Sequence, residues 1–293
     1  MSGRLPPIAL AAILTLAGCQ GTPAPTRPVV VVTVYPLWEL ARPVAGDRAE
    51  VVSLVPPGVE PHDWEPSARD ATLVQRATVF IHSGTGLDAW AARLLTGLPG
   101  RIRVIDASIG LGLLRQGGSV DPHVWLDPTL ARTQVQTIAS GLAQADPAGG
   151  PVYLENAAAF AARLDALDQA FAAGLRDCAR RELVTSHAAF AYLVRRYGLT
   201  QVSIMGLAPE AEPSPADLGA IVQTARRLKV THVFFEPLMS PRLAQTLARE
   251  IGATTLPLDP IEGVSREQAA AGTGYVELMQ GNLANLRVGL GCR

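Results

Sequence analysis

Lysine is almost absent from this sequence: Lys229 is the only one, so arginine supplies nearly all of the positive charge. Basic and acidic side chains nearly cancel, at 25 and 26 residues, and the formal net charge is −1. A chain without a positive excess lacks the electrostatic signature of a nucleic-acid-binding protein, so we expect no nucleic acid partner. We attribute the shortage of lysine to genome composition rather than to function.

Aromatic and charged side chains are also scarce, at 5% and 17% of the chain, whereas hydrophobic residues make up 48%. This balance excludes an intrinsically disordered chain, which combines low hydrophobicity with many charges. The 293 residues are enough for two modest domains, or for one large domain with a sizeable core.

Long hydrophobic runs are missing as well. The run from Ile8 to Leu16 is too short for a membrane-spanning helix. It leads into Leu16-Ala17-Gly18-Cys19, which resembles the lipobox of a bacterial lipoprotein. We therefore expect a signal peptide over residues 1–19 with lipidation at Cys19, and a flexible tether over residues 20–28, which are rich in Pro, Thr and Gly. The alternative is an ordinary buried helix. The lipoprotein interpretation predicts an exported protein, anchored by lipid in the periplasm or on the outer face of the cell membrane.

Only three cysteines occur, and lipidation of Cys19 would leave Cys178 and Cys292. Exported proteins meet an oxidising compartment, where two thiols can form a disulfide and here would tie the C-terminus to the second domain. They can equally be two unrelated thiols, because the sequence does not show whether they meet.

Short apolar, β-branched runs alternate with helical patterns along the chain. We expect strands at residues 29–35, 50–55, 78–82, 102–105, 182–186, 200–204, 231–235 and 254–258. Capping boxes that begin at Ser67 and Ser214 mark two of the helices between them, and a final helix is expected from about Arg266 to Leu286. Strands that alternate with helices form parallel sheets, so the predicted fold is α/β with two doubly wound lobes, at residues 29–147 and 179–293.

One long rigid helix is predicted to join the lobes, within residues 148–178. The helical pattern runs from Tyr153 to about Asp177, with apolar residues mostly three or four positions apart. At about 1.5 Å per residue such a helix is long enough to cross both lobes. We expect it to permit small tilting of the lobes rather than wide hinge motion.

Two similar stretches carry histidines: Pro61-His62-Asp63-Trp64 and Pro122-His123-Val124-Trp125, each followed by a proline and a helix start. Downstream, His187 and Asp259 directly follow predicted strands. Ligands of open α/β sheets bind beyond the carboxyl ends of the strands. The four residues are therefore predicted to face one another across a cleft between the lobes and to form a metal site.

Three imidazoles and one carboxylate suit four-coordinate Zn²⁺, whereas harder Mn²⁺ favours more oxygen ligands. A coordination sphere supplied entirely by the protein holds an ion, while catalytic zinc keeps a position open for water. Asp63, Asp121 and Glu236 are candidates for orienting the imidazole N–H groups. Trp64 and Trp125 are candidates for shielding the site from water, and an N-cap role is expected for Asp127.

The chain resembles the metal-binding lipoproteins of zinc and manganese ABC importers, the cluster A-I solute-binding proteins. The resemblance covers residue 29 to the C-terminus. It rests on the stretches Pro61-His62-Asp63-Trp64-Glu65-Pro66-Ser67, Pro122-His123-Val124-Trp125-Leu126-Asp127-Pro128, Thr185-Ser186-His187-Ala188-Ala189-Phe190-Ala191-Tyr192, Glu212-Pro213-Ser214, Phe234-Phe235-Glu236-Pro237 and Leu258-Asp259-Pro260. It implies metal ligation by His62, His123, His187 and Asp259, an ABC permease as partner, and a monomeric binding protein rather than an enzyme.

By the same resemblance, a histidine at the third ligand position favours zinc over manganese. The chain departs from many zinc members in the segment before His123, because residues 106–120 contain no histidine and only one acid, Asp106. Manganese or iron therefore stays as an alternative cargo. A zinc-dependent hydrolase of the cell envelope is a further alternative, although no glutamate has the spacing of a His-Glu-x-x-His motif.

Overall fold

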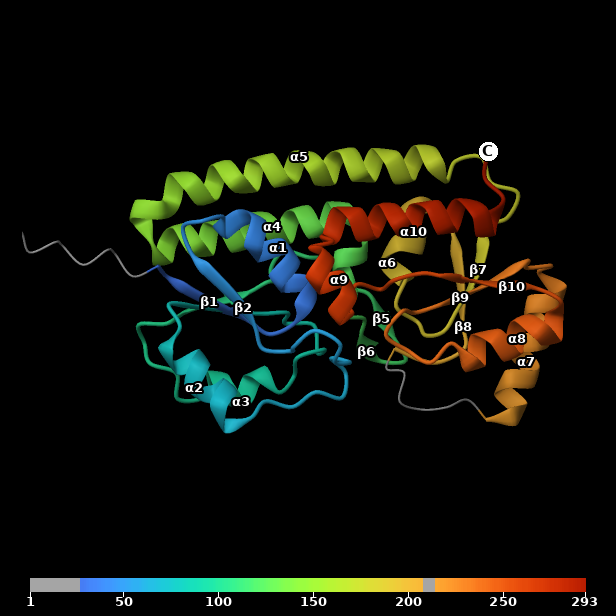
Figure 1. Cartoon of the computed structure of the whole chain (residues 1–293), viewed down its shortest axis with the longest axis horizontal. Helices are drawn as coiled ribbons and strands as arrows, with labels where there is room; N and C mark the ends of the chain where they lie inside the picture. The colour runs from blue at the N-terminus through green and yellow to red at the C-terminus, as the bar shows by residue number, and fades with distance from the viewer. Residues whose placement is uncertain (1–26, 208–213) are drawn as a thin grey trace, which may run out of the picture.

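A computed structural model describes residues 27–207 and 214–293, which form two α/β lobes side by side (Figure 1). Each lobe contains a four-stranded parallel sheet. The predicted fold class and the recurrence of the same architecture in both halves are confirmed. The lipobox cysteine, Cys19, and nearly all of the expected tether lie outside the described residues.

The sheet of the first lobe has the strand order β2-β1-β3-β4, with β1 at its centre. Its elements are β1 (Val29–Val32), α1 (Tyr35–Ala45), β2 (Glu50–Ser53), α2 (Ala68–Arg76), β3 (Val79–His82), α3 (Ala91–Leu95) and β4 (Arg103–Asp106). The β1 strand is four consecutive valines, three of them fully buried, as expected for a strand covered on both faces.

The sheet of the second lobe has the order β10-β9-β7-β8. Its elements are β7 (Glu182–Thr185), α6 (Ala191–Tyr197), β8 (Thr200–Ser203), α7 (Pro215–Arg227), β9 (His232–Phe235), α8 (Arg242–Ile251) and β10 (Thr254–Pro257). In both lobes the order reverses beside the first strand, and this is where doubly wound sheets leave a crevice.

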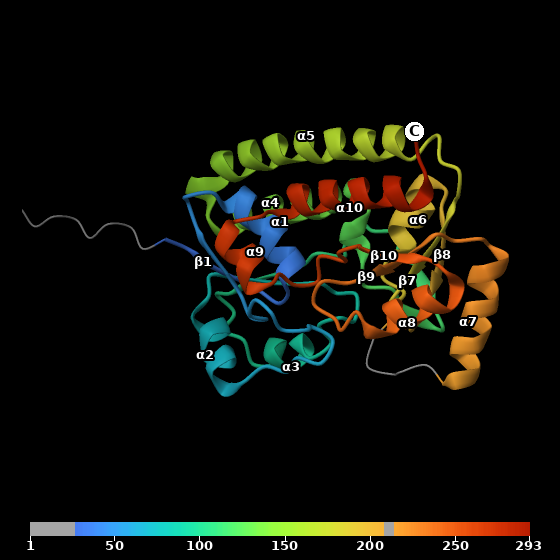
Figure 2. The same cartoon turned by 45° about the vertical axis from the view of Figure 1, so that its right-hand side comes forward.

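Helices rather than a flexible linker connect the lobes. The connection comprises β5 (Arg115–Gln116), β6 (Ser119–Val120), η1 (Val124–Leu126), α4 (Pro128–Ala145), η2 (Pro147–Gly149) and α5 (Gly150–Gly174). The 25 residues of α5 span about 37 Å, and Figures 1 and 2 both show this helix passing over the two lobes. It is the predicted interlobe helix, and it ends three residues earlier than the pattern suggested.

The C-terminal segment departs from the prediction of one helix over residues 266–286. It forms α9 (Arg266–Ala271) and α10 (Tyr275–Leu290), separated at Gly272. Gly272 has φ +67°, a left-handed conformation that ends α9, and glycine adopts it without a Cβ penalty. The α10 helix then runs beside the second half of α5 in the same direction and also contacts α1 and the second sheet (Figure 2).

One hydrophobic core extends through both lobes. It contains Val30 and Phe80 of the first sheet, Phe171 of α5, and Phe190 and Met279 of the second half, all fully buried. A smaller second cluster lies between the second sheet, α7 and α8. Because the main core is continuous, the lobes cannot separate without exposing apolar surface, which costs about 25 cal/mol per Å².

Local signals account for several helix starts. The expected capping boxes are present at Ser67 with Asp70 and at Ser214 with Asp217, and each serine accepts the backbone N–H three residues on. Asp127 accepts from Thr129 N and caps α4, as predicted. The helices in the two described stretches are each too short or too polar to span a lipid bilayer.

Cys178 and Cys292 are joined in a disulfide across 114 positions of sequence. The bridge fastens the C-terminus to the segment that follows α5, where Ala179 N also donates to Gly291 O. The sequence left open whether these cysteines form a disulfide or are two unrelated thiols, and the structure shows the disulfide.

Replacing both cysteines by serine should therefore lower the free energy of unfolding by about 2–5 kcal/mol, since a long loop closed by a disulfide strongly restricts the unfolded chain. Guanidinium denaturation of the double variant and the wild type measures this difference. Wild-type protein treated with a reducing agent is the matched control and should behave like the variant. Two titratable thiols in untreated, exported wild type would contradict the pairing.

Candidate metal centre

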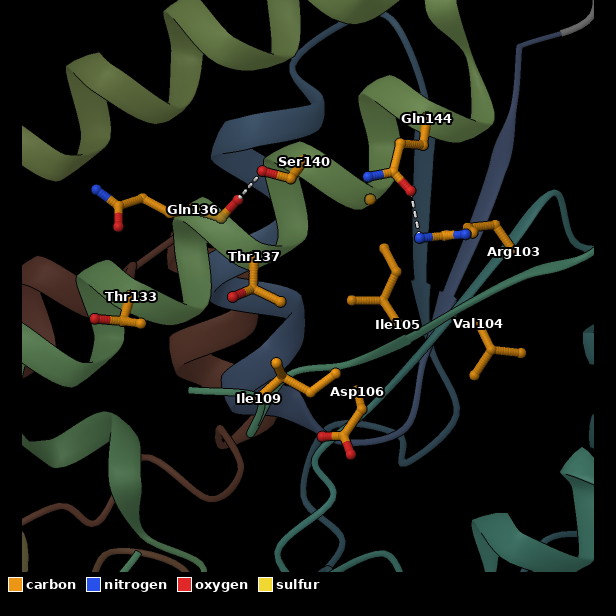
Figure 3. Close-up of a pocket in the computed structure, with 11 residues that line it drawn as sticks. Arg103, Val104, Ile105, Asp106, Ile109, Thr133, Gln136, Thr137, Ser140 and Gln144 are labelled. Carbon is orange, nitrogen blue, oxygen red and sulfur yellow. Dashed lines mark hydrogen bonds between the residues drawn. The ribbon is translucent and has the colours of Figure 1, made fainter. Parts of the chain in front are cut away.

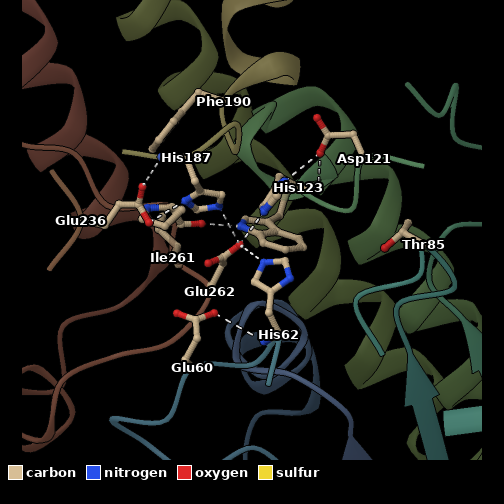
Figure 4. A network of polar contacts seen from close by, with 12 residues as sticks. Glu60, His62, Thr85, Asp121, His123, His187, Phe190, Glu236, Ile261 and Glu262 are labelled. Carbon is tan, nitrogen blue, oxygen red and sulfur yellow. Dashed lines mark hydrogen bonds and ion pairs between the residues drawn. The ribbon is translucent and has the colours of Figure 1, made fainter. Parts of the chain in front are cut away.

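The three histidines of the sequence motifs meet between the lobes, together with one glutamate (Figure 4). His62 lies in the loop after β2, and His123 lies between the β5–β6 hairpin and η1. His187 comes two residues after β7, and Glu262 lies in the loop after β10. Each lobe thus contributes two side chains from loops beyond its parallel strands.

The four side chains converge on one point. One ligand atom from each lies within 4.8 Å of all the others. The Oε1 atom of Glu262 is 3.0 Å from His62 Nε2 and 3.5 Å from His187 Nε2, and it also contacts His123 Nε2. All four side chains are at most 8% exposed. The group is therefore closed off from bulk water.

Two of the imidazoles are fixed in direction by carboxylates on their far side (Figure 4). His123 Nδ1 lies 2.8 Å from Asp121 Oδ1, and His187 Nδ1 lies 2.7 Å from Glu236 Oε2. The same carboxylates accept the backbone N–H of His123 and His187. Such partners set the tautomer and ring orientation of metal-binding histidines, leaving Nε2 free for the ion. The predicted orienting roles of Asp121 and Glu236 match this geometry.

His187 Nε2 is buried and makes no hydrogen bond of good geometry among the described residues, although it lies 3.5 Å from Glu262 Oε1. An unpaired buried polar atom is costly, so one that persists at a converging site indicates a missing binding partner. A cation at the centre of the group would supply it.

The other expected neighbours have different outcomes. Trp125 is fully buried with its ring centroid 5.5 Å from that of His123, as a shielding residue would be. Trp64 packs edge-on against Trp90, at 4.7 Å between ring centroids. Asp63 is exposed and makes no hydrogen bond that the structure records, so the geometry assigns it no orienting role.

Asp259, the expected fourth ligand, is not part of the converging group; Glu262 takes that place. The Asp259 carboxylate instead accepts the backbone N–H of Ile261 at 2.8 Å. Sequence reasoning missed Glu262 because both carboxylates lie in the loop after the last strand, only three residues apart. From the sequence, either acid of this loop is a candidate ligand. Choosing between Asp259 and Glu262 requires the path of the backbone.

In the metal-free site, the carboxylate of Glu262 and the imidazoles of His123 and His187 favour each other's charged forms. Burial by itself raises the pKa of Glu262, but the charges of His123 and His187 outweigh it and hold that pKa well below the usual value. Burial likewise lowers the pKa of His187, but Glu262 and Glu236 outweigh it and raise the pKa to about 11. Burial also lowers the pKa of His123, but Glu262 and Asp121 outweigh it and raise that pKa above its usual value.

Protonation of His187 therefore stabilises the metal-free fold. Its folded pKa of about 11 lies above the ordinary 6.5, so the contribution is complete below pH 6.5 and is lost as the pH rises toward 11. A divalent cation replaces these protons, because imidazole binds metal only in its neutral form. Metal affinity must therefore increase with pH.

Apart from this group, a pocket of about 350 Å³ lies between β4 and α4 (Figure 3). Thr133, Gln136, Ser140 and Gln144 of α4 face Arg103 and Ile105 across it. Its lining contains one acid, Asp106, and no histidine. Metal-ligating side chains are thus gathered at the interlobe group and not here.

Comparison with known proteins places these features in context. Residues 30–289 match the family described as "zinc-uptake complex component A periplasmic". The high-affinity zinc uptake system protein ZnuA of Bacillus subtilis is 34% identical over 274 residues, which cover 88% of this chain and 86% of that protein. The zinc-binding lipoprotein AdcA of Streptococcus pneumoniae is 38% identical over 275 residues, covering 88% of this chain and 55% of AdcA. The chain thus spans about half the length of that relative.

Among solved structures, the Zn(II)-bound ZnuA-like domain of Streptococcus pneumoniae AdcA has a TM-score of 0.81 at 38% identity. The match covers 90% of this chain and 99% of that domain. The arrangement of two lobes around a long helix is therefore shared over the whole domain.

Removing the carboxylate at the centre should lower the pKa of His187. In metal-free wild type the ring should remain protonated above pH 9, whereas in Glu262→Gln the largest charge that opposes burial is gone and deprotonation should occur at lower pH. Ring ¹⁵N NMR shifts followed against pH measure both values. A wild-type His187 that loses its proton near pH 6.5 would contradict the charged arrangement.

Proposed function

Because the chain belongs to the family of periplasmic zinc-uptake components, we propose that it captures Zn²⁺ outside the cytoplasm and delivers it to an ABC permease for import. The observation that carries this proposal is the convergence of three imidazole nitrogens and the Glu262 carboxylate at one buried point between the lobes. We propose His62, His123, His187 and Glu262 as the ligands, in place of the set with Asp259.

The donor set supports zinc as the cargo. Zn²⁺ binds nitrogen and oxygen at about 2.0–2.2 Å with tetrahedral geometry, which places neighbouring ligand atoms about 3.3 Å apart. The 3.0 and 3.5 Å separations from Glu262 Oε1 lie on either side of that value. Mn²⁺ prefers more oxygen ligands than one glutamate supplies, so manganese and iron are the less favoured cargoes.

The site is built for holding an ion rather than for hydrolysis. Four protein ligands complete a tetrahedral sphere, whereas catalytic zinc needs a position for water and a nearby base. The family is a transport component, in agreement with this geometry. The hydrolase is therefore the less favoured alternative.

The proposal extends to the location and partners of the chain. The lipobox-like sequence at Cys19 supports a lipid-anchored, exported protein. The permease would recognise the folded chain as a monomer, since each chain contains all four proposed ligands.

Metal selectivity is the direct test. Metal-free protein offered equimolar Zn²⁺ and Mn²⁺, then separated from free ions, should retain one zinc per chain by elemental analysis. The reason is that the three imidazoles favour the softer ion. Retention of manganese in preference to zinc would overturn the assignment of the cargo.

Single substitutions should rank the side chains by their contact with the ion. His123→Ala should weaken zinc binding by more than about 100-fold, because it removes a proposed ligand, and Asp121→Ala by about 10–100-fold, because it frees the ring of His123. Affinity is measured by competition with a chelator of known strength. His232→Ala is the matched control, since His232 lies at the start of β9 outside the group, and its affinity should equal that of wild type. An unchanged affinity in His123→Ala would remove this residue from the proposed ligands.

Metal binding should change the overall shape very little. The continuous core and the α5–α10 pair resist wide opening, so only small tilting of the lobes is expected. Small-angle X-ray scattering with and without zinc should give the same radius of gyration within error. A large contraction on adding zinc would show hinge closure instead.

A further inference from the structure

The residue before the glutamate of the metal centre has an unusual backbone conformation. Ile261 has φ +58°, and Lys229 is the only other non-glycine residue with positive φ in the described ranges. A left-handed conformation is disfavoured for any residue with a Cβ and is an outlier for a β-branched one. Ile261 is also fully buried. Its surroundings must therefore hold it in place.

Two polar side chains provide that hold. The Asp259 carboxylate accepts the backbone N–H of Ile261. This hydrogen bond to the residue two positions on forms a turn that aspartate and asparagine side chains favour. Asn282 of α10 binds both backbone groups of Asp259: its Oδ1 accepts from Asp259 N at 2.8 Å, and its Nδ2 donates to Asp259 O at 2.6 Å. Asp259 and Asn282 are 9% and 2% exposed, so water competes little for these bonds.

The rest of the loop is tied down on both sides of Ile261. Trp125 donates its indole N–H to Pro260 O at 2.8 Å, and Gly58 N donates to Val264 O at 2.8 Å. At Gly263 a Cβ would lie 2.7 Å from Leu238 Cδ1 and 3.4 Å from Val59 O, so a larger residue there would require the Leu238 side chain to move. The path from Asp259 to Val264 is therefore determined at nearly every residue.

The left-handed residue decides where Glu262 points. Returning Ile261 to an ordinary negative φ would rotate the following chain by roughly 120° and turn the Glu262 side chain away from the histidines. We propose that Asp259 and Asn282 are positioning residues that hold Ile261 in this conformation and thereby aim the Glu262 carboxylate at His62, His123 and His187. This inference rests on the proposed function for its effect on zinc, and on the backbone alone for its geometry.

The two roles conceivable for Asp259 predict different results for a conservative substitution. Asp259→Asn keeps an oxygen that can accept the Ile261 N–H but removes the negative charge. As a positioning residue, Asp259 can be replaced by asparagine with nearly wild-type zinc affinity, whereas Asp259→Ala should lose about 10–100-fold. As a metal ligand, it would lose affinity in both variants. Asn282→Ala should weaken binding in the same range, although Asn282 lies on α10 outside the group of ligating atoms.

The experiment compares zinc titrations of wild type, Asp259→Asn, Asp259→Ala and Asn282→Ala, with thermal unfolding confirming that each is folded. Asp106→Ala is the matched control. Its carboxylate accepts from Ser108 N at 2.8 Å in the same kind of turn at the end of β4, and it is not part of the converging group, so the zinc affinity should not change. Absorption of the Co²⁺-loaded proteins reports the coordination: Asp259→Asn should reproduce the wild-type bands, and Asp259→Ala should not.

A crystal structure of metal-free Asp259→Ala separates this inference from the proposed function. Ile261 should leave the left-handed region and Glu262 should leave the histidines, whether or not the wild type prefers zinc. A wild type that does not bind zinc would overturn the proposed function alone. An unmoved loop with unchanged affinity in Asp259→Ala, or equal losses in Asp259→Asn and Asp259→Ala, would overturn the positioning role.

Discussion

The contact of one buried carboxylate with three imidazoles is the interaction on which the rest of this structure depends. Glu262 and His187 come from the second lobe, and His62 and His123 come from the first. Buried charges are tolerable only when they are paired and hydrogen-bonded, and here Asp121 and Glu236 complete the pairing on the outer side of two rings. The arrangement therefore requires both lobes to be held in register.

The frame that holds the lobes in register also reaches the site directly. The α5 helix passes over both lobes above a continuous core, and α10 runs beside it over the second lobe and contacts α1 of the first. Tyr192 of the second lobe accepts from Leu114 N and donates to Asp121 O, which ties it to the segment before His123. Asn282 of α10 binds the loop that carries Glu262. The four side chains are thus already gathered in the structure, and the proposed metal centre would need only small movements to admit and release an ion.

Much of the fold followed from short-range pattern. The valine run of β1, the capping boxes at Ser67 and Ser214, and the N-cap at Asp127 depend on residues within a few positions of one another, so sequence alone predicts them. The division of the last helix at Gly272 was not predicted, because a single glycine can also lie inside a helix at modest cost. The short β5–β6 hairpin was missed for a related reason, as its turn at Gly117 and Gly118 lies in a glycine-rich stretch without apolar alternation.

The candidate site, like the fold, has a part that follows from short-range pattern and a part that depends on long-range contacts. Sequence by itself predicted that the three histidines would meet. His62 and His123 lie in proline-bounded motifs and His187 follows a strand, and the carboxyl ends of parallel strands gather at one edge of a sheet. For the fourth member the sequence predicted Asp259, whereas the converging group contains Glu262. Only the tertiary structure decided which acid, since Asp259 and Glu262 are equivalent in residue chemistry and lie in one loop. The left-handed turn at Ile261, held by Asp259 and by Asn282 from a distant helix, points Glu262 inward, and no pattern within the loop encodes that long-range contact.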